Sequence, residues 1–164
     1  ITLELKGNKP YLWDDIYTGG GGRYDPGSDY TVPGEALSDP AFAALITEAE
    51  KYLGWPYVWG GSSPSTSFDC SGFVCWVYTA SGVHNLPRTT ATGIFNQCAY
   101  VSPADARPGD LIFFTKTYNC DGPVSHVGIY VGDGMMIHAG DPIKYASINT
   151  NYWQEHFYAF GRLN

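Results

Sequence analysis

Hydrophobic residues recur at helical spacing in the first part of the chain. Ser38-Asp39-Pro40 is a helix-start signal, and the apolar positions that follow predict one buried helical face ending at Gly54. That face comprises Phe42, Leu45, Ile46, Ala49 and Leu53. The segment CSGFVCWVYTAS predicts a second helix over residues 70–81, with Asp69 as its cap. A third helix is predicted from about Thr89 to Gln97.

After Pro108-Gly109-Asp110 the pattern changes to that of strands separated by Gly and Asp turns. The predicted strands are LIFFT, SHVGIYVG, MMIHAG and the closing FYAFGRL. Helices followed by an antiparallel sheet predict an α+β fold. Residues 1–38 hold Gly19–Gly22 and further turn formers without a sustained period, so we expect an irregular arm or interdomain linker there. Residues 39–164 then form one domain.

Composition excludes several classes of protein. The chain has 164 residues, 44% of them hydrophobic, which is enough for one complete core. Its formal net charge of -7 and scattered Lys and Arg residues argue against nucleic acid and an anionic membrane surface as partners. No apolar stretch approaches the roughly 20 residues of a membrane span, and no signal peptide is visible. The sequence reads as a mature protein or a fragment of a longer one.

Four cysteines give the first chemical signal. Cys70 follows a loop and opens a predicted helix, where backbone N–H groups and the helix dipole are expected to lower its thiol pKa and can stabilise an oxyanion. Gly72 would leave room for a substrate backbone. Cys75 lies inside the same helix and reads as a core residue, whereas Cys98 and Cys120 either pair or stay free. Without a C-x-x-C motif or finger-type histidine spacing, we expect no metal site.

A thiol nucleophile needs a base, and His126 and His138 lie on consecutive predicted strands. A two-residue loop at Gly132-Asp133 would turn the two imidazoles to opposite faces of the sheet. A three-residue loop that includes Gly134 would make them diagonal neighbours on one face, with backbones about 7–8 Å apart. Strand histidines are more often core or rim residues, but the combination with a helix-opening cysteine favours catalysis.

The other two histidines carry less signal. His84 lies in a loop and is expected to be solvated. His156, in QEHFY, has no obvious partner in the sequence.

Five segments in order resemble the NlpC-type cell-wall cysteine peptidases: YVWGG, FDCSGFVCWVY, RPGDLIFF, SHVGIYVGDGMMIHAG and FYAFGRL. The similarity runs from about residue 42 to residue 163, and its D-C-S-G and S-H-V-G-I-Y blocks are specific. It implies a compact papain-like fold with Cys70 as nucleophile, His126 as base and His138 orienting His126. It also implies that Tyr57 lies beside the thiol, where residues alone would suggest a packed aromatic.

The resemblance further implies that Asp69 faces the substrate groove and can hold a free amino group, and that Ser71 can act similarly. The safer interpretation of Asp69 from the residues is a helix cap. Arg88 in NLPRTT also matches a common position of the family but is left outside the catalytic set.

The implied activity is hydrolysis of peptidoglycan stem peptides, typically at the bond between D-γ-glutamate and the next diamino acid, without a cofactor. Within the family the chain most resembles the C-terminal peptidase domain of hydrolases carried by conjugative transposons, where it follows a lysozyme-like domain. A secreted or wall-associated monomer, tethered to a second hydrolase domain, is therefore expected. An N-acetylmuramoyl-L-alanine amidase, a non-catalytic wall-binding module and an acyltransferase remain alternatives.

Overall fold

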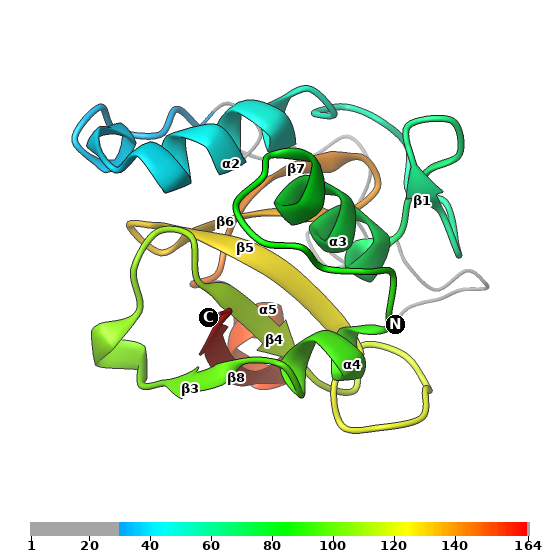
Figure 1. The fold of residues 1–164 in the computed structure, drawn as a ribbon. Helices are drawn as coiled ribbons and strands as arrows, with labels where there is room; N and C mark the ends of the chain where they lie inside the picture. The colour runs from blue at the N-terminus through cyan, green and yellow to red at the C-terminus, as the bar shows by residue number, and fades with distance from the viewer. Residues whose placement is uncertain (1–29, 164) are drawn as a thin grey trace.

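A six-stranded antiparallel sheet forms the centre of the protein, in the order β3-β8-β4-β5-β6-β7 (Figure 1). The structure is a computed structural model that describes residues 30–163. The strands are β3 Ala99–Val101, β4 Leu111–Phe114, β5 His126–Gly132, β6 Met135–Ala139, β7 Ile143–Ser147 and β8 Phe157–Arg162. The helices α2 Pro40–Glu50 and α3 Cys70–Ala80 cover one face, and the short helix α5 Asn151–His156 lies on the other. The predicted α+β fold is confirmed.

Short elements connect these layers. They are η2 Ala36–Ser38, β1 Ser62–Ser63, β2 Ser67–Phe68, α4 Ala91–Phe95 and η3 Pro103–Asp105. β1 and β2 form a small hairpin directly before α3.

Strand β4 shows why the sheet is covered on both faces. Leu111 and Phe113 belong to the hydrophobic cluster beneath α2 and α3, whereas Ile112 and Phe114 belong to the cluster beneath α5. Successive side chains of a strand point to opposite faces, so the run LIFF can be fully buried only between two layers.

The predicted helices form with some changes at their ends. Asp39 caps α2 by accepting a hydrogen bond from the Ala41 N–H at 3.1 Å, and Pro40 takes the first helical position. The helix ends at Glu50, so Leu53, predicted on the buried face, is instead exposed. α4 spans only Ala91–Phe95, shorter than the predicted helix, and it starts at Ala91 because the Thr90 side chain caps it.

Strands β3 and β7 and the helix α5 are absent from the sequence-based prediction. Four of the five residues of β7 are buried and they show no polar alternation, so the segment IKYAS lacks the usual strand pattern. α5 has six residues, too few for a helical period to be recognised. β3 is a three-residue strand at the edge of the sheet.

The β5–β6 hairpin has the register that places both histidines on one face. Ile129 pairs with Ile137 and Tyr130 with Met136, as the longer predicted loop requires. The loop itself differs from that prediction, because Gly132 pairs with Met135 and a bulge lies between Tyr130 and Gly132. The chain therefore reaches the expected register through a tight turn plus a bulge.

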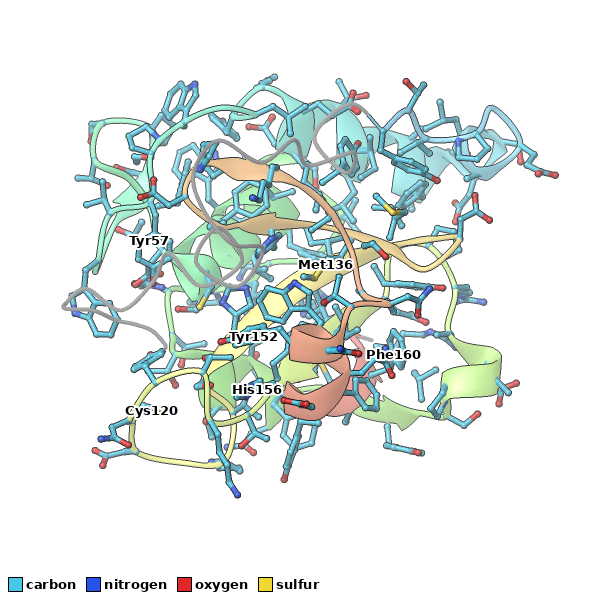
Figure 2. The ribbon with its side chains drawn as sticks, turned by 180° about the vertical axis from the view of Figure 1, so that it is seen from behind. Tyr57, Cys120, Met136, Tyr152, His156 and Phe160 are labelled. Carbon is cyan, nitrogen blue, oxygen red and sulfur yellow. The ribbon has the colours of Figure 1, made fainter. Side chains whose placement is uncertain are left out.

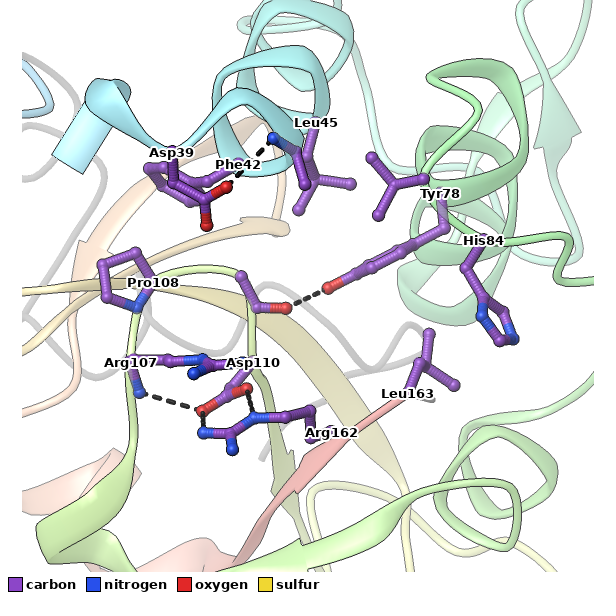
Figure 3. A pocket seen from close by; sticks show the side chains of 13 residues that line it. Asp39, Phe42, Leu45, Tyr78, His84, Arg107, Pro108, Asp110, Arg162 and Leu163 are labelled. Carbon is purple, nitrogen blue, oxygen red and sulfur yellow. Dashed lines mark hydrogen bonds and ion pairs between the residues drawn. The ribbon is translucent and has the colours of Figure 1, made fainter.

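The turn before β4 is held by the last strand of the chain. Asp110 is buried and accepts two hydrogen bonds from Arg162, at 2.7 Å from Nε and 2.9 Å from Nη2 (Figure 3). The Tyr78 hydroxyl donates to the Gly109 carbonyl from α3. A cavity of about 250 Å³ lies beside this turn, and none of the predicted site residues lines it. The R-P-G-D segment thus acts as an anchor between α3 and β8.

The first described residues pack on the body of the domain. Val32 is buried in the main core, and the Tyr30 ring lies edge-on to that of Tyr145 with centroids 5.3 Å apart. The Tyr30 hydroxyl donates to Asp133 Oδ2 at 3.2 Å. Residues 1–29 of the predicted arm lie outside the described residues.

Gly72 is the point of closest approach between α3 and the preceding loop. A Cβ atom at this position would lie 2.0 Å from the Gly61 carbonyl oxygen. The expectation that Gly72 makes room for substrate is therefore wrong at this contact, since the space holds the backbone of the chain itself.

We predict that Gly72→Ala destabilises the protein by about 1–3 kcal/mol or more, because the added methyl group must displace either α3 or the backbone at Gly61. Thermal and urea unfolding would measure the loss. Gly34→Ala is the matched control, because a Cβ there meets nothing within 4 Å. Equal stability of the two variants would contradict this account.

Candidate active site

Cys70 is the first residue of α3, and its side chain is buried. Asp69 caps the helix by accepting a hydrogen bond from the Gly72 N–H at 2.8 Å. The Cys70 thiol donates to the Ser125 carbonyl oxygen at 3.9 Å, and Ser125 directly precedes His126. The fold therefore brings the helix-opening cysteine to the start of the strand that carries His126.

The environment of the thiol differs from the expectation. Burial raises the pKa of Cys70 to about 12, and the Asp69 carboxylate acts in the same direction. Hydrogen bonds from the backbone N–H groups of Val127 and Ser71 lower the pKa, as does the charge of Arg88, but burial dominates. The structure therefore contradicts the prediction that the helix N-terminus lowers the pKa of this thiol, because burial outweighs it.

His126 and His138 meet, as one of the two hairpin registers predicts. His126 Nε2 lies 2.9 Å from His138 Nδ1, and the ring centroids are 5.1 Å apart at an angle of 86°. Both side chains are almost completely buried, at 1% and 0% exposed. Two imidazoles so close share one hydrogen bond, which fixes the orientation of both rings.

Asp69 and Ser71 belong to a polar network that also contains Arg88. Arg88 donates from Nη2 to Asp69 Oδ2 at 2.9 Å and from Nη1 to Ser71 Oγ at 2.8 Å. Asp69 Oδ2 also accepts from the Gly60 N–H at 3.0 Å, so the predicted cap is confirmed and connects two further segments. Arg88, which the sequence left outside the catalytic set, compensates the charge of Asp69 beside the thiol.

An open cavity of about 350 Å³ lies over Cys70. Asp69, Ser71 and Arg88 line it together with the aromatic residues Tyr57, Trp59 and Tyr118. Burial raises the pKa of Tyr57 well above its ordinary value, and the carboxylate of Asp69 acts in the same direction. Tyr57 lines the same cavity as Cys70.

Two further aromatic residues of this cavity, Trp59 and Tyr118, were not predicted as site residues. Trp59 is 61% exposed, and its ring lies edge-on to Tyr118 with centroids 5.0 Å apart. Tyr118 comes from the β4–β5 loop, and its pKa is raised by burial and by Cys70. No motif marks this loop, since Tyr118 lies seven residues before the S-H-V-G block.

The remaining cysteines do not take part in the site. Cys75 is buried, as expected, and its thiol donates to the Pro87 carbonyl at 3.6 Å. Cys98 and Cys120 are both free in the structure, so the disulfide alternative does not apply. Cys120 lies in the β4–β5 loop, well separated from α5 in Figure 2.

His156 has partners that the sequence did not reveal. Its Nδ1 lies 2.8 Å from the Thr115 carbonyl oxygen, and its ring contacts Tyr152 with centroids 4.4 Å apart; both rings belong to α5 (Figure 2). His84 is half-buried, where a solvated position was expected, and lines the cavity beside Asp110 (Figure 3). Neither histidine lines the cavity over Cys70.

Within residues 30–163, no helix combines the length and hydrophobicity needed to cross a membrane. The same part of the chain holds no group of three or more His, Cys, Asp and Glu residues arranged to bind a metal ion.

Comparison with known proteins identifies the family of the chain. Residues 54–162 match the NlpC/P60 family. The chain belongs to this family. The resemblance inferred from the sequence is thereby confirmed.

Three relatives illustrate the match. The bifunctional muramidase/DL-endopeptidase CwlT of Bacillus subtilis is 42% identical over 142 residues, covering 86% of this chain and 42% of the relative. The gamma-DL-glutamyl hydrolase of the same organism is 41% identical over 122 residues, covering 71% of this chain and 29% of the relative. A solved NLP/P60-family structure from Staphylococcus aureus shares 45% identity with a TM-score of 0.74, covering 76% of this chain and 42% of that one. The chain thus spans less than half the length of these relatives.

We predict that Arg88 controls the reactivity of Cys70 through Asp69. Arg88→Ala leaves the Asp69 carboxylate uncompensated, which raises the pKa of Cys70 further and slows its alkylation severalfold at a fixed pH below that pKa. Asp69→Asn keeps a helix cap but removes the charge, so alkylation becomes faster. The measurement is the rate of iodoacetamide labelling at Cys70 against pH, read by peptide mass.

The exposed Arg107, in the turn before β4, provides the control. Arg107→Ala should leave the labelling rate of Cys70 unchanged. Slower labelling in both Arg88→Ala and Asp69→Asn would show that disruption of the network, not its charge, governs the thiol.

Proposed function

We propose that the protein is a cysteine endopeptidase that hydrolyses peptidoglycan stem peptides, most specifically at the bond between D-γ-glutamate and the following diamino acid. The observation that carries this proposal is the buried thiol of Cys70 at the start of the strand that bears the hydrogen-bonded His126–His138 pair. Membership of the NlpC/P60 family supports it, and two relatives are named as a DL-endopeptidase and a gamma-DL-glutamyl hydrolase.

In the first step, Cys70 Sγ would attack the carbonyl carbon of the γ-glutamyl bond while its proton passes to His126. Because His126 Nε2 is engaged by His138, Nδ1 is the nitrogen that exchanges this proton. For Nδ1 to accept, Nε2 must carry hydrogen and donate to His138 Nδ1, which sets the tautomers of both rings. A neutral thiol makes this base necessary, since little thiolate exists beforehand.

The tetrahedral intermediate carries a negative oxygen that needs donors. The backbone N–H groups of Ser71 and Val127 already point to the sulfur and are suited to this task as the oxygen develops beside it. His126 would then protonate the leaving amine, which breaks the C–N bond and leaves a thioester on Cys70. Water activated by His126 hydrolyses the thioester and regenerates the thiol.

The two sides of the cavity suit different parts of a stem peptide. Asp69, paired with Arg88 and next to Ser71, offers a carboxylate for a free amino group of the substrate. Tyr57 can donate its hydroxyl toward the reacting carbonyl. We infer that residues 39–164 act as one catalytic domain and that residues 1–38 are an arm, in a secreted or wall-associated monomer tethered to a second hydrolase domain.

The experiment that tests the function is mass spectrometry of purified peptidoglycan after incubation with wild type and with Cys70→Ala. We expect fragments cut after D-glutamate from the wild type alone. Cleavage at the muramoyl–alanine bond would instead identify an amidase, and fragments that carry a new acyl–amine linkage would identify an acyltransferase. Binding without any Cys70-dependent fragment, on walls of several chemical types, would identify a non-catalytic module.

A second prediction concerns His138. His138→Ala removes the acceptor that fixes the tautomer of His126, so kcat should fall by about 10²-fold while KM changes little. His138→Asn retains an acceptor oxygen and should keep more activity. Steady-state kinetics on a synthetic γ-D-glutamyl peptide measures both; an equal loss in the two variants, or a loss confined to KM, would contradict the orienting role.

A further inference from the structure

Trp153 of α5 contacts both imidazoles of the site, although no sequence motif marks it. Its ring is stacked on that of His126, with centroids 5.3 Å apart and an interplanar angle of 23°. It meets the ring of His138 edge to face, at 5.4 Å and 87°. The Trp153 side chain is 1% exposed and is among the largest fully buried side chains of the described chain.

The position of Trp153 is fixed by its surroundings. The Thr150 side chain caps α5 by accepting a hydrogen bond from the Trp153 N–H at 3.2 Å. Phe114 of β4 packs on Trp153 with centroids 4.5 Å apart and also reaches His126 at 6.0 Å. Figure 2 places α5 against the sheet on the side of Met136 and Phe160, opposite to the face that α3 covers.

We propose that Trp153 is a positioning residue, which holds the His126–His138 pair in its hydrogen-bonded geometry and stabilises the protonated form of His126. The inference rests on the proposed function, in which His126 must alternate between base and acid. A stacked ring prevents rotation of the His126 imidazole, and the edge contact does the same for His138. The arrangement therefore restricts both rings of the pair from one side.

The face of an indole also attracts a cation. Trp is the strongest of the aromatic side chains in this respect, within about 6 Å of its centroid, and the attraction is stronger where water is excluded. When His126 takes the proton of Cys70, the imidazolium forms directly over this face. Burial alone would disfavour that charge, so the indole offsets part of the cost of the first step.

Other groups also act on the charge of this pair. Lys144 of β7 is directly opposite His138 in the strand register and is buried, and its positive charge opposes protonation of the imidazoles. A measured pKa of His126 contains all of these contributions. The titratable and charged groups near the pair or on the elements packed against it include Tyr57, Cys70, Tyr130, Lys144, Tyr145, Tyr152, Glu155 and His156.

The test compares Trp153→Leu and Trp153→Phe with the control Phe160→Leu. Phe160 belongs to the same buried cluster, but its aromatic contacts are with Tyr130 and Phe157. Two quantities are measured in folded protein: kcat and KM on a γ-D-glutamyl peptide, and the pKa of His126 by NMR in a Cys70→Ala background. Thermal unfolding of each variant provides the measure of general stability.

We expect the pKa of His126 to fall by about 0.5–1.5 units in Trp153→Leu and by less in Trp153→Phe, with kcat falling in the same order and KM nearly constant. Phe160→Leu should lose stability without either shift. An unchanged His126 pKa in both Trp153 variants, or an equal shift in Phe160→Leu, would overturn the proposal. Because the NMR titration needs no turnover, it decides on Trp153 even if the wild type cleaves no peptidoglycan.

Discussion

The contact between the backbones of Gly72 and Gly61 is the constraint on which the site depends. Only residues without a Cβ allow the first turn of α3 to approach the loop so closely, with Gly61 O at 2.0 Å from where a methyl carbon would stand. Asp69 then holds both sides together, since its carboxylate accepts from Gly72 and from Gly60. The position of the Cys70 thiol follows from this clamp, because Cys70 lies between its two ends.

Burial of Cys70 makes its thiolate form less favourable. Enclosure fixes the position of the thiol but also removes water from it. The loss of water raises the pKa of Cys70 to about 12, which outweighs the lowering effect of the helix N-terminus. The neighbouring groups are arranged to reduce that cost, since Arg88 offsets the carboxylate of Asp69 and two backbone N–H groups meet the sulfur. Proton transfer from Cys70 to a fixed imidazole is then the step that the fold must support. The sheet supplies that imidazole, because it carries the hydrogen-bonded pair His126 and His138.

The sequence was informative wherever a residue acts through its immediate neighbours. The Asp69 cap, the α2 and α3 helices and the strands from β4 to β6 follow from local patterns. The pKa of Cys70 could not be predicted, because it depends on burial by segments distant in the chain. Helix α5 was missed for a similar reason: six residues carry no period, and Trp153 is recognisable only through the rings that it contacts.

Ser125 shows how distant parts of the site are joined. Its carbonyl oxygen accepts a hydrogen bond from the Cys70 thiol. Its hydroxyl oxygen lies 2.5 Å from the Thr117 hydroxyl oxygen and accepts a hydrogen bond from the Thr117 N–H at 2.9 Å. Thr117 precedes Tyr118, so one buried serine fixes the nucleophile, the start of the histidine strand and the aromatic side of the cavity. A shift of this residue would move all three together, and its burial keeps water from competing for its hydrogen bonds.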